Sequence, residues 1–270
     1  MGDYRSIEEA GVGIVVSRDG AVAVLEIDRQ ASLNALDIGA VTELELRIRE
    51  LSEDARVRCV VLTGAGDRAF IGGADLEYMS QVTPDQAREF AEVGHQVGRL
   101  LETMPKPTIA AVNGYALGGG CEIALACDIR YASSNARLGQ PEVSFGLIPG
   151  WGGSQRLART TTLGFAKELI FTGRYVDAEE ALRRGLVDAI VDPVLDKALE
   201  SARLIARNSP SAVAAAKELC NRALQGRHAA NLAAECERIA EVLVSEDARE
   251  GCTAFLERRE PAFAVAGSSA

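Results

Sequence analysis

The stretch KPTIAAVNGYALGGGCE, residues 106–122, decides the fold of this chain. Its first part, residues 107–112, is a short apolar run that predicts a buried strand. Gly114 and then three consecutive glycines, residues 118–120, follow this strand, and the apolar run 121–126 predicts a short helix. Glycines at a helix start leave backbone N–H groups free, and the helix dipole adds positive charge there. The unit is therefore a strand, a tight glycine turn and a helix.

Towards the N-terminus the sequence alternates in the same way. Strands are predicted over residues 22–27 and 57–62, and helices over residues 36–51 and 87–101. Strands that alternate with helices indicate an α/β fold with parallel pairing. Because the strands are short and irregularly spaced, an ordinary doubly wound sheet is not required. A superhelix of repeated β-turn-α units fits the pattern equally well.

From residue 161 onward the pattern is helical. Apolar residues recur at helical spacing over 163–171, 178–184, 194–207, 210–224, 231–243 and 248–255. Asp177 and Asp192 each precede a predicted helix and suit an N-cap or a turn. We therefore divide the chain into an α/β body, residues 1–191, and a helical C-terminal region, residues 192–270.

Composition limits the classes of function. The chain has 270 residues, of which 47% are hydrophobic and 25% charged, so a disordered or fibrous protein is excluded. Its 39 acidic and 29 basic residues give a formal net charge of −10. An acidic chain is repelled by phosphate backbones and anionic lipid, so we expect neither nucleic acid nor membrane as a partner. No apolar stretch approaches the roughly 20 residues of a membrane span.

Cysteine and histidine usage argues against a metal site. The six cysteines and two histidines include no CxxC motif and no pair at zinc-binding spacing. No secretory signal precedes the first predicted strand. We expect reduced, mostly buried thiols, a cytoplasmic location and no bound metal.

Glu122 is the first candidate catalytic residue. It lies within the apolar run 121–126, and burial there would raise its pKa towards neutrality. The alternative is a side chain that points outward from a half-buried helix. The glycines ahead of it suit a phosphate or a developing oxyanion. They lack the Gly-Lys-Ser/Thr end of a P-loop and the GxGxxG spacing, so nucleotide binding is a poor fit.

Two further loops carry candidate groups. In GGAD, residues 72–75, the glycines allow a tight turn with an exposed amide, and Asp75 can cap the next helix; a plain capped turn is the alternative. Glu142 closes the motif GQPE, residues 139–142, ahead of a glycine- and proline-rich loop that holds Trp151. Glu122 and Glu142 form a candidate general acid–base pair. The alternative for Glu142 is an ordinary loop carboxylate.

Together and in this order, these motifs resemble the enoyl-CoA hydratase (crotonase) family. The resemblance rests on residues 106–122 and on four shorter motifs, with further matches at residues 34–36, 172–173 and 251–259. The four motifs are ACD at 126–128, GQPE at 139–142, IPG at 148–150 and GGSQRL at 152–157. The resemblance covers nearly the whole chain.

The resemblance implies a fold and an assembly. The fold is α/β, a crotonase-type superhelix of β-β-α turns with a C-terminal helical trimerisation region. Members of the family form trimers that usually pair into hexamers, so we expect a homotrimer or homohexamer. Apolar residues on the predicted helices after residue 193 agree with this, because one body is unlikely to cover them all.

The implied activity is that of an enoyl-CoA hydratase, a hydro-lyase. Such an enzyme adds water reversibly across the 2,3 double bond of a 2-enoyl-CoA thioester, and both glutamates of the hydratases are present at Glu122 and Glu142. One alternative is an enoyl-CoA isomerase or another acyl-CoA lyase or hydrolase of the superfamily. A second, from another class, is an idle scaffold or RNA-binding relative, against which the intact pair and the negative charge argue.

The resemblance also assigns roles by position. The backbone N–H groups of Ala74 and Gly119 would hold the thioester oxygen, Glu122 would activate water, and Glu142 would protonate Cα. The other substrate-binding residues expected are Ser32, Leu33, Gly73, Asp75, Leu76, Gly118 and Trp151. Coenzyme A is part of the substrate, and no other cofactor is expected.

Two positions depart from the family pattern. The segment 29–34 lacks the lysine with which many relatives contact coenzyme A, so the backbone of Ser32 and Leu33 is left to contact adenine or pantetheine. Trp151 stands at a loop position that is often small. Either it lines the acyl pocket and restricts chain length, or it packs on the body. Arg156 and Arg159 are expected to hold this loop.

Overall fold

The strand and the helix predicted around the triple glycine are both present. The computed structural model describes residues 5–7, 13–223, 239 and 245–263. In it the strand is β6, Thr108–Val112, and the helix is α4, Gly119–Ala126. A short strand that the sequence pattern did not reveal, β7 (Tyr115–Leu117), lies between them. The repeating unit therefore contains two strands and a helix.

The strands form two sheets. The larger sheet contains β1 (Arg5–Ile7), β2 (Ile14–Asp19), β3 (Val22–Ile27), β4 (Cys59–Gly64), β6, β8 (Ile129–Ala132) and β11 (Ala189–Ile190), adjacent in that order. The smaller contains β10 (Tyr175–Asp177), β9 (Arg137–Gly139), β7 and β5 (Ala69–Ile71). Pairing is parallel from β3 to β11 and among β5, β7 and β9. From β4 to β9 the chain alternates between the sheets, which confirms the predicted superhelix of β-β-α turns.

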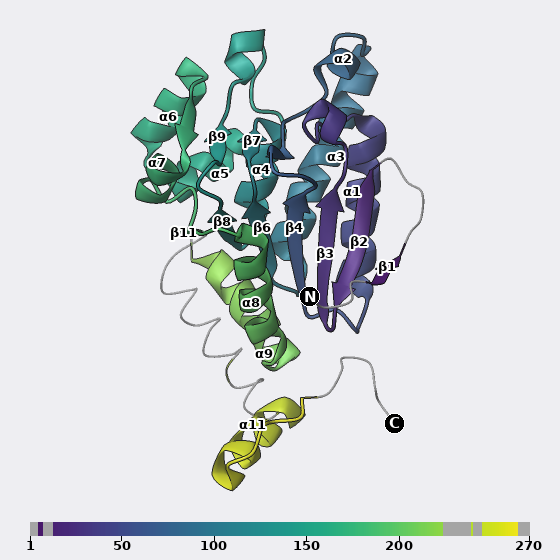
Figure 1. Ribbon diagram of the computed structural model, residues 1–270, viewed down its shortest axis with the longest axis vertical. Coiled ribbons are helices and arrows are strands. Elements are labelled where there is room, and N and C mark those ends of the chain that lie inside the picture. The colour runs from purple at the N-terminus through teal and green to yellow at the C-terminus, as the bar shows by residue number, and fades with distance from the viewer. Residues whose placement is uncertain (1–4, 8–12, 224–238, 240–244, 264–270) are drawn as a thin grey trace.

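The helices pack around the sheets, except for the last one, residues 246–257, which lies away from them (Figure 1). The helices are α1 (Ile38–Glu53), α2 (Leu76–Met79), α3 (Pro84–Thr103), α4, α5 (Gly153–Thr160), α6 (Leu163–Thr172), α7 (Ala178–Arg183), α8 (Val194–Ala206), α9 (Pro210–Arg222) and α11 (Glu246–Glu257), with short 3-10 turns at Gln30–Ser32 and Glu142–Phe145. Helix α5 was not predicted, because its segment reads as a glycine-rich polar loop. The helix predicted over residues 231–243 lies outside the described residues except for Ile239.

Alternation along the central strands divides the core between two faces of the larger sheet. In β3, the side chain of Leu25 belongs to one hydrophobic cluster. This cluster also contains Leu44 from α1 and Val97 from α3. Val24, the neighbour of Leu25, belongs to a second cluster, which α8 completes. Side chains alternate across a strand, so one run of Val, Leu and Ile serves both faces. Helix α8 is thus packed on the sheet, while the division of the chain at residues 191 and 192 stays a prediction.

The later helices are tied to the body by polar contacts. The ammonium group of Lys217 on α9 lies 2.7 Å from Asp128 and donates to the carbonyl oxygens of Leu101 and Lys106 at 2.8 and 3.0 Å. On α11, Asp247 accepts a hydrogen bond from Ser211 at 3.1 Å. These contacts fix α9 and α11 to the chain that precedes them.

The two predicted helix caps differ in outcome. Asp177 caps α7, where its carboxylate accepts from the N–H of Glu180 at 2.8 Å. Asp192 does not cap α8, because Pro193 occupies the N-cap position and Asp192 instead accepts from the backbone N–H of Ser134 at 3.2 Å. The N-cap prediction for Asp192 is therefore wrong.

Candidate active site

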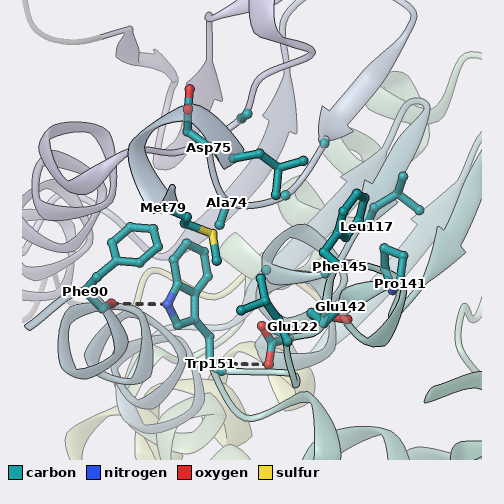
Figure 2. A pocket seen from close by; sticks show the side chains of 18 of the residues that line it. Ala74, Asp75, Met79, Phe90, Leu117, Glu122, Pro141, Glu142, Phe145 and Trp151 are labelled. Atoms are coloured by element: carbon teal, nitrogen blue, oxygen red, sulfur yellow. Dashed lines mark hydrogen bonds between the residues drawn. The ribbon is translucent and has the colours of Figure 1, made fainter. Parts of the chain in front are cut away.

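A cavity of about 590 Å³ lies beside the triple glycine, walled by α2, α3, α4 and the loop around residues 141–151 (Figure 2). Its wall contains every site residue predicted from the sequence: Ser32, Leu33, Gly73, Ala74, Asp75, Leu76, Gly118, Gly119, Glu122, Glu142 and Trp151. Residues up to 119 positions apart in the chain thus meet in one place.

Hydrogen bonds fix the backbone on both sides of Ala74 but do not involve its own N–H group. Leu36 donates to the carbonyl oxygen of Gly73 at 2.9 Å and accepts from the N–H of Asp75 at 2.9 Å. These bonds fix the backbone on both sides of Ala74. Asp75 caps α2 as predicted, since its carboxylate accepts from the N–H of Tyr78 at 2.9 Å. Within the described ranges the N–H of Ala74 donates to no protein acceptor.

Gly119 offers the second amide. Gly118 has φ +51°, a left-handed conformation that favours glycine, and its N–H donates to the carbonyl oxygen of Gly139 at 2.9 Å. The chain then enters α4 at Gly119, whose N–H is one of the unpaired groups at a helix start. Among the residues that the structure describes, it has no acceptor. Two unpaired amides on the wall of one cavity suit an oxygen that gains negative charge.

Close packing explains why the glycines come as a run. A Cβ atom on Gly119 would lie 2.4 Å from Cζ3 of Trp151, and one on Gly120 would lie 2.0 Å from the carbonyl oxygen of Ile71. Gly118 needs its left-handed backbone. Each of the three glycines therefore answers a separate steric requirement.

Glu122 is buried, with 2% of its surface exposed, so the outward-facing alternative is wrong. Its Oε1 accepts from the N–H groups of Trp151 at 2.8 Å and Gly153 at 2.6 Å, at the start of α5. Burial raises the pKa of Glu122, while these two amides and the positive charge of Arg156 oppose the rise. A carboxylate that accepts two amides at a helix N-terminus has its ionised form stabilised.

Arg156 secures the loop that carries these amides, as predicted. Its guanidinium donates to both carboxylate oxygens of Glu102, at 2.7 and 2.9 Å, and to the carbonyl oxygen of Trp151 at 2.6 Å. A bidentate contact of this kind fixes the orientation of both partners. Arg159, for which we expected the same role, is exposed on α5 and makes no hydrogen bond or ion pair with the described part of the chain.

Glu142 has a different environment. It begins the 3-10 turn Glu142–Phe145 and is partly buried, and burial together with the charge of Glu122 raises its pKa to about 7. The buried amide of Gln140, in the orientation that satisfies its neighbours, donates to Oε1 of Glu142 at 2.8 Å. Burial raises the pKa of both glutamates. They differ because two amides and Arg156 oppose the rise at Glu122, whereas the charge of Glu122 adds to it at Glu142.

The sequence analysis missed several residues of this site. Phe90 and Gly94, on one face of α3, hold the indole of Trp151, and Gln140 contacts Glu142. The spacing of Phe90 and Gly94 on an apolar helix face was visible in the sequence, but it did not indicate a partner. Gln140 was quoted only as a letter of a motif, although a fully buried amide between a glycine and a proline needs a polar neighbour.

Neither a metal cluster nor a membrane-spanning helix occurs in the described residues. They contain no group of three or more His, Cys, Asp or Glu side chains placed to hold a metal ion. They also contain no helix that is both long and apolar enough to cross a membrane.

Comparisons with known proteins agree with this geometry. The model of the family described as enoyl-CoA hydratase/isomerase matches residues 17–265. The short-chain-enoyl-CoA hydratase of Clostridium acetobutylicum is 46% identical over 249 residues, which cover 92% of this chain and 95% of the relative. The crotonyl-CoA hydratase of Syntrophomonas wolfei is 40% identical over 252 residues, with coverage of 93% and 97%. A crystal structure of an enoyl-CoA hydratase from Bacillus anthracis superimposes with a TM-score of 0.90 at 39% identity, covering 93% of this chain and 98% of that one.

Proposed function

This chain belongs to the enoyl-CoA hydratase/isomerase family, and from that premise we propose that it is an enoyl-CoA hydratase. It adds water reversibly across the 2,3 double bond of a 2-enoyl-CoA thioester. One observation carries the proposal: two glutamates whose pKa values are both raised by burial line the same cavity as two unpaired amides. An isomerase or a hydrolase would not need both carboxylates for its proton transfers.

The amides of Ala74 and Gly119 would act on the thioester oxygen. When water adds at Cβ, the electrons of the double bond move towards the carbonyl and its oxygen gains negative charge. Donors fixed in advance stabilise that charge without reorganising, and one such donor typically contributes about 2.7–4 kcal/mol to the transition state. The bonds of Leu36 on both sides of Ala74 and the start of α4 at Gly119 provide this preorganisation.

The glutamates would divide the proton transfers. Glu122, whose ionised form is stabilised by the amides of Trp151 and Gly153, takes a proton from water as the water oxygen bonds to Cβ. Glu142, protonated near neutral pH, gives its proton to Cα as the enolate returns to a thioester. The pair begins and ends with one proton, which has moved from Glu142 to Glu122. The mechanism calls on no metal ion and no cofactor beyond the coenzyme A of the substrate.

An absorbance assay tests the proposed activity. Crotonyl-CoA loses the absorbance of its conjugated thioester when water adds, and we expect this loss to depend on the enzyme. A thiol reagent run in parallel should detect no free coenzyme A. Absence of turnover on 2-enoyl-CoAs of every chain length would contradict the proposal, and release of free thiol would indicate a hydrolase instead.

The shared proton predicts the pH dependence. The active form carries one proton on the pair, so activity falls once that proton is lost, and the pKa of Glu142 sets this at about pH 7. Above that value we expect kcat/KM for hydration to drop towards tenfold per pH unit. Dehydration of 3-hydroxybutyryl-CoA uses the same pair with the proton on Glu122, so both directions should share one profile. Rates that stay constant from pH 6 to 9 would contradict the assignment.

We also propose that the chain assembles as a homotrimer or homohexamer. Leu204 on α8 and Ile239 are 54% and 50% exposed, and apolar side chains of this size on exposed helices suit a subunit interface. We expect sedimentation at micromolar concentration to give three or six times the 28.6 kDa of one chain. An active species at 28.6 kDa would contradict the proposal.

A cytoplasmic location is part of the same proposal. Five cysteines are described, and each has a free thiol: Cys59, Cys121, Cys127, Cys220 and Cys252. Reduced thiols are typical of a reducing compartment. The net charge of −10 argues against nucleic acid or an anionic membrane surface as partner.

A further inference from the structure

We propose that Trp151, seated against Gly94, ends the acyl subsite and makes this enzyme selective for short 2-enoyl-CoAs of about four acyl carbons. The inference rests on the proposed hydratase function and adds the substrate class. It concerns a side chain that neither donates to the reacting atoms nor moves a proton. The observation behind the proposal is that the indole of Trp151 fills the space between α3 and α4.

The indole spans the gap from α3 to α4. A Cβ atom on Gly94 would lie 2.1 Å from Cδ1 and Nε1 of Trp151, while one on Gly119 would lie 2.4 Å from Cζ3 and 2.5 Å from Cε3. The five-membered ring thus packs on α3, and the six-membered ring packs on the residue that offers the second amide. Trp151 is 4% exposed although it lines the cavity. Little space is left on either side of the ring.

Several contacts hold the indole in this orientation. Its Nε1 donates to the carbonyl oxygen of Phe90 at 3.2 Å, and its ring meets the Phe90 ring edge-on with centroids 5.1 Å apart. Phe90 in turn meets Tyr78 edge-on, also at 5.1 Å. Figure 2 shows the indole between Phe90 and Glu122, beneath Met79 and Ala74. The ring is therefore a rigid wall rather than a side chain free to swing aside.

The wall stands where a longer acyl chain would continue. With the thioester oxygen at the amides of Ala74 and Gly119, as proposed above, the reacting carbons lie beside Gly119, against which the six-membered ring of Trp151 packs. Carbons beyond Cβ would extend along the part of the cavity wall that the indole forms. A hydrophobic pocket distinguishes chains that differ by one methylene by about 10–200-fold, so a fixed wall at this position is enough to set a preference.

The absence of a side chain at Gly94 leaves room for the indole of Trp151. Any side chain there would occupy the place of the pyrrole ring, and α3 is otherwise a regular helix in which glycine is unfavourable. Gly94 and Trp151 are both buried, and the size of each residue depends on the other. The pair predicts that the two positions are coupled in a double-mutant cycle.

A chain-length series tests the proposal. For the wild-type protein we expect kcat/KM to be highest for crotonyl-CoA and to fall steeply for the C6, C8 and C10 2-enoyl-CoAs. Trp151→Ala should raise the C8:C4 ratio of kcat/KM at least tenfold, because the vacated space receives the longer chain. Phe171→Ala, an equal loss of an aromatic side chain at a position that is 70% exposed on α6, should leave the ratio unchanged. A wild-type profile that is flat from C4 to C10, or an unchanged ratio in Trp151→Ala, would overturn the proposal.

Binding without turnover separates this inference from the hydratase proposal. Trp151 is the single tryptophan of the chain, so its fluorescence reports on the subsite alone. Butyryl-CoA, which has no double bond to hydrate, should change the emission at lower concentration than octanoyl-CoA, and coenzyme A alone should leave it unchanged. This result would support the subsite even if no 2-enoyl-CoA were hydrated. Equal responses to all three compounds would overturn it.

The double-mutant cycle covers the case in which Trp151→Ala does not fold. Gly94→Ala alone should lower the thermal midpoint, because its methyl group clashes with the indole. Combined with Trp151→Phe, whose smaller ring leaves room, the same substitution should cost clearly less. Gly164→Ala on α6, where an added Cβ meets nothing within 4 Å, is the matched control and should not lower the midpoint. Equal costs of Gly94→Ala with Trp or Phe at residue 151 would contradict the pairing.

Discussion

Replacing Glu122 or Glu142 by glutamine should each reduce kcat for crotonyl-CoA by roughly 10²–10⁴. Glutamine keeps the size of the side chain but can neither take the proton of water nor give one to Cα. Butyryl-CoA should bind either variant within a few-fold of its affinity for the wild type, because the cavity and both amides remain. Stopped-flow turnover and equilibrium titration measure the two effects separately.

The double variant should lose far less than the product of the two single losses. The residues act as a unit that shares one proton, so once either carboxylate is gone the other has little left to contribute. Glu179→Gln, which removes an exposed carboxylate on α7 away from the cavity, serves as a comparison and should leave kcat unchanged. A single variant that hydrates crotonyl-CoA at the wild-type rate would remove that residue from the pair.

Gly119→Pro should be at least a hundredfold less active than Gly119→Ala. Both substitutions place a Cβ atom against the indole of Trp151, so they share the clash at Cβ. Only proline also removes the N–H, and loss of one oxyanion donor typically costs about 10²–10³ in kcat. Proline is tolerated at the first position of a helix, where α4 begins, so the helix itself should form.

The comparison between proline and alanine isolates the amide. Circular dichroism of both variants checks that they fold alike, and kcat with crotonyl-CoA gives the difference. Equal activities of the two variants would show that the Gly119 amide does not hold the thioester oxygen. A similar test at Ala74 is less clean, because a proline there would strain the segment that Leu36 holds on both sides.

Sequence reasoning recovered the long helices and the central strands β3, β4 and β6, but it missed the short strands and also β2, which has six residues. A helix of twenty residues such as α3, or a six-residue strand such as β4, repeats its apolar pattern often enough to be recognised. The strands of the smaller sheet, β5, β7, β9 and β10, have three residues each, which is too few to establish a period. Helix α5 was missed because its apolar residues are few and its start is glycine-rich.

In the candidate site, too, some features could be predicted from the sequence and others could not. The burial of Glu122 was predictable, since its neighbours in the run 121–126 are all apolar. The sequence assigned Glu122 to activating water and Glu142 to protonating Cα, but it could not reveal the amides of Trp151 and Gly153 that donate to Glu122 from another loop. The match between Gly94 and Trp151 was also invisible, since residues 57 positions apart are brought together only by the packing of α3 on α4.

Incubation with crotonyl-CoA in H₂¹⁸O tests the central claim most directly, because it shows where the oxygen of water goes. The hydratase mechanism predicts intact 3-hydroxybutyryl-CoA with one ¹⁸O in the hydroxyl group at C3, detected by mass spectrometry of the thioester and its fragments. Glu122→Gln should slow the appearance of this label by the same factor as it slows turnover. Free coenzyme A with ¹⁸O in a released carboxylate, or a shifted double bond without any ¹⁸O, would contradict the assignment of this chain as a hydratase.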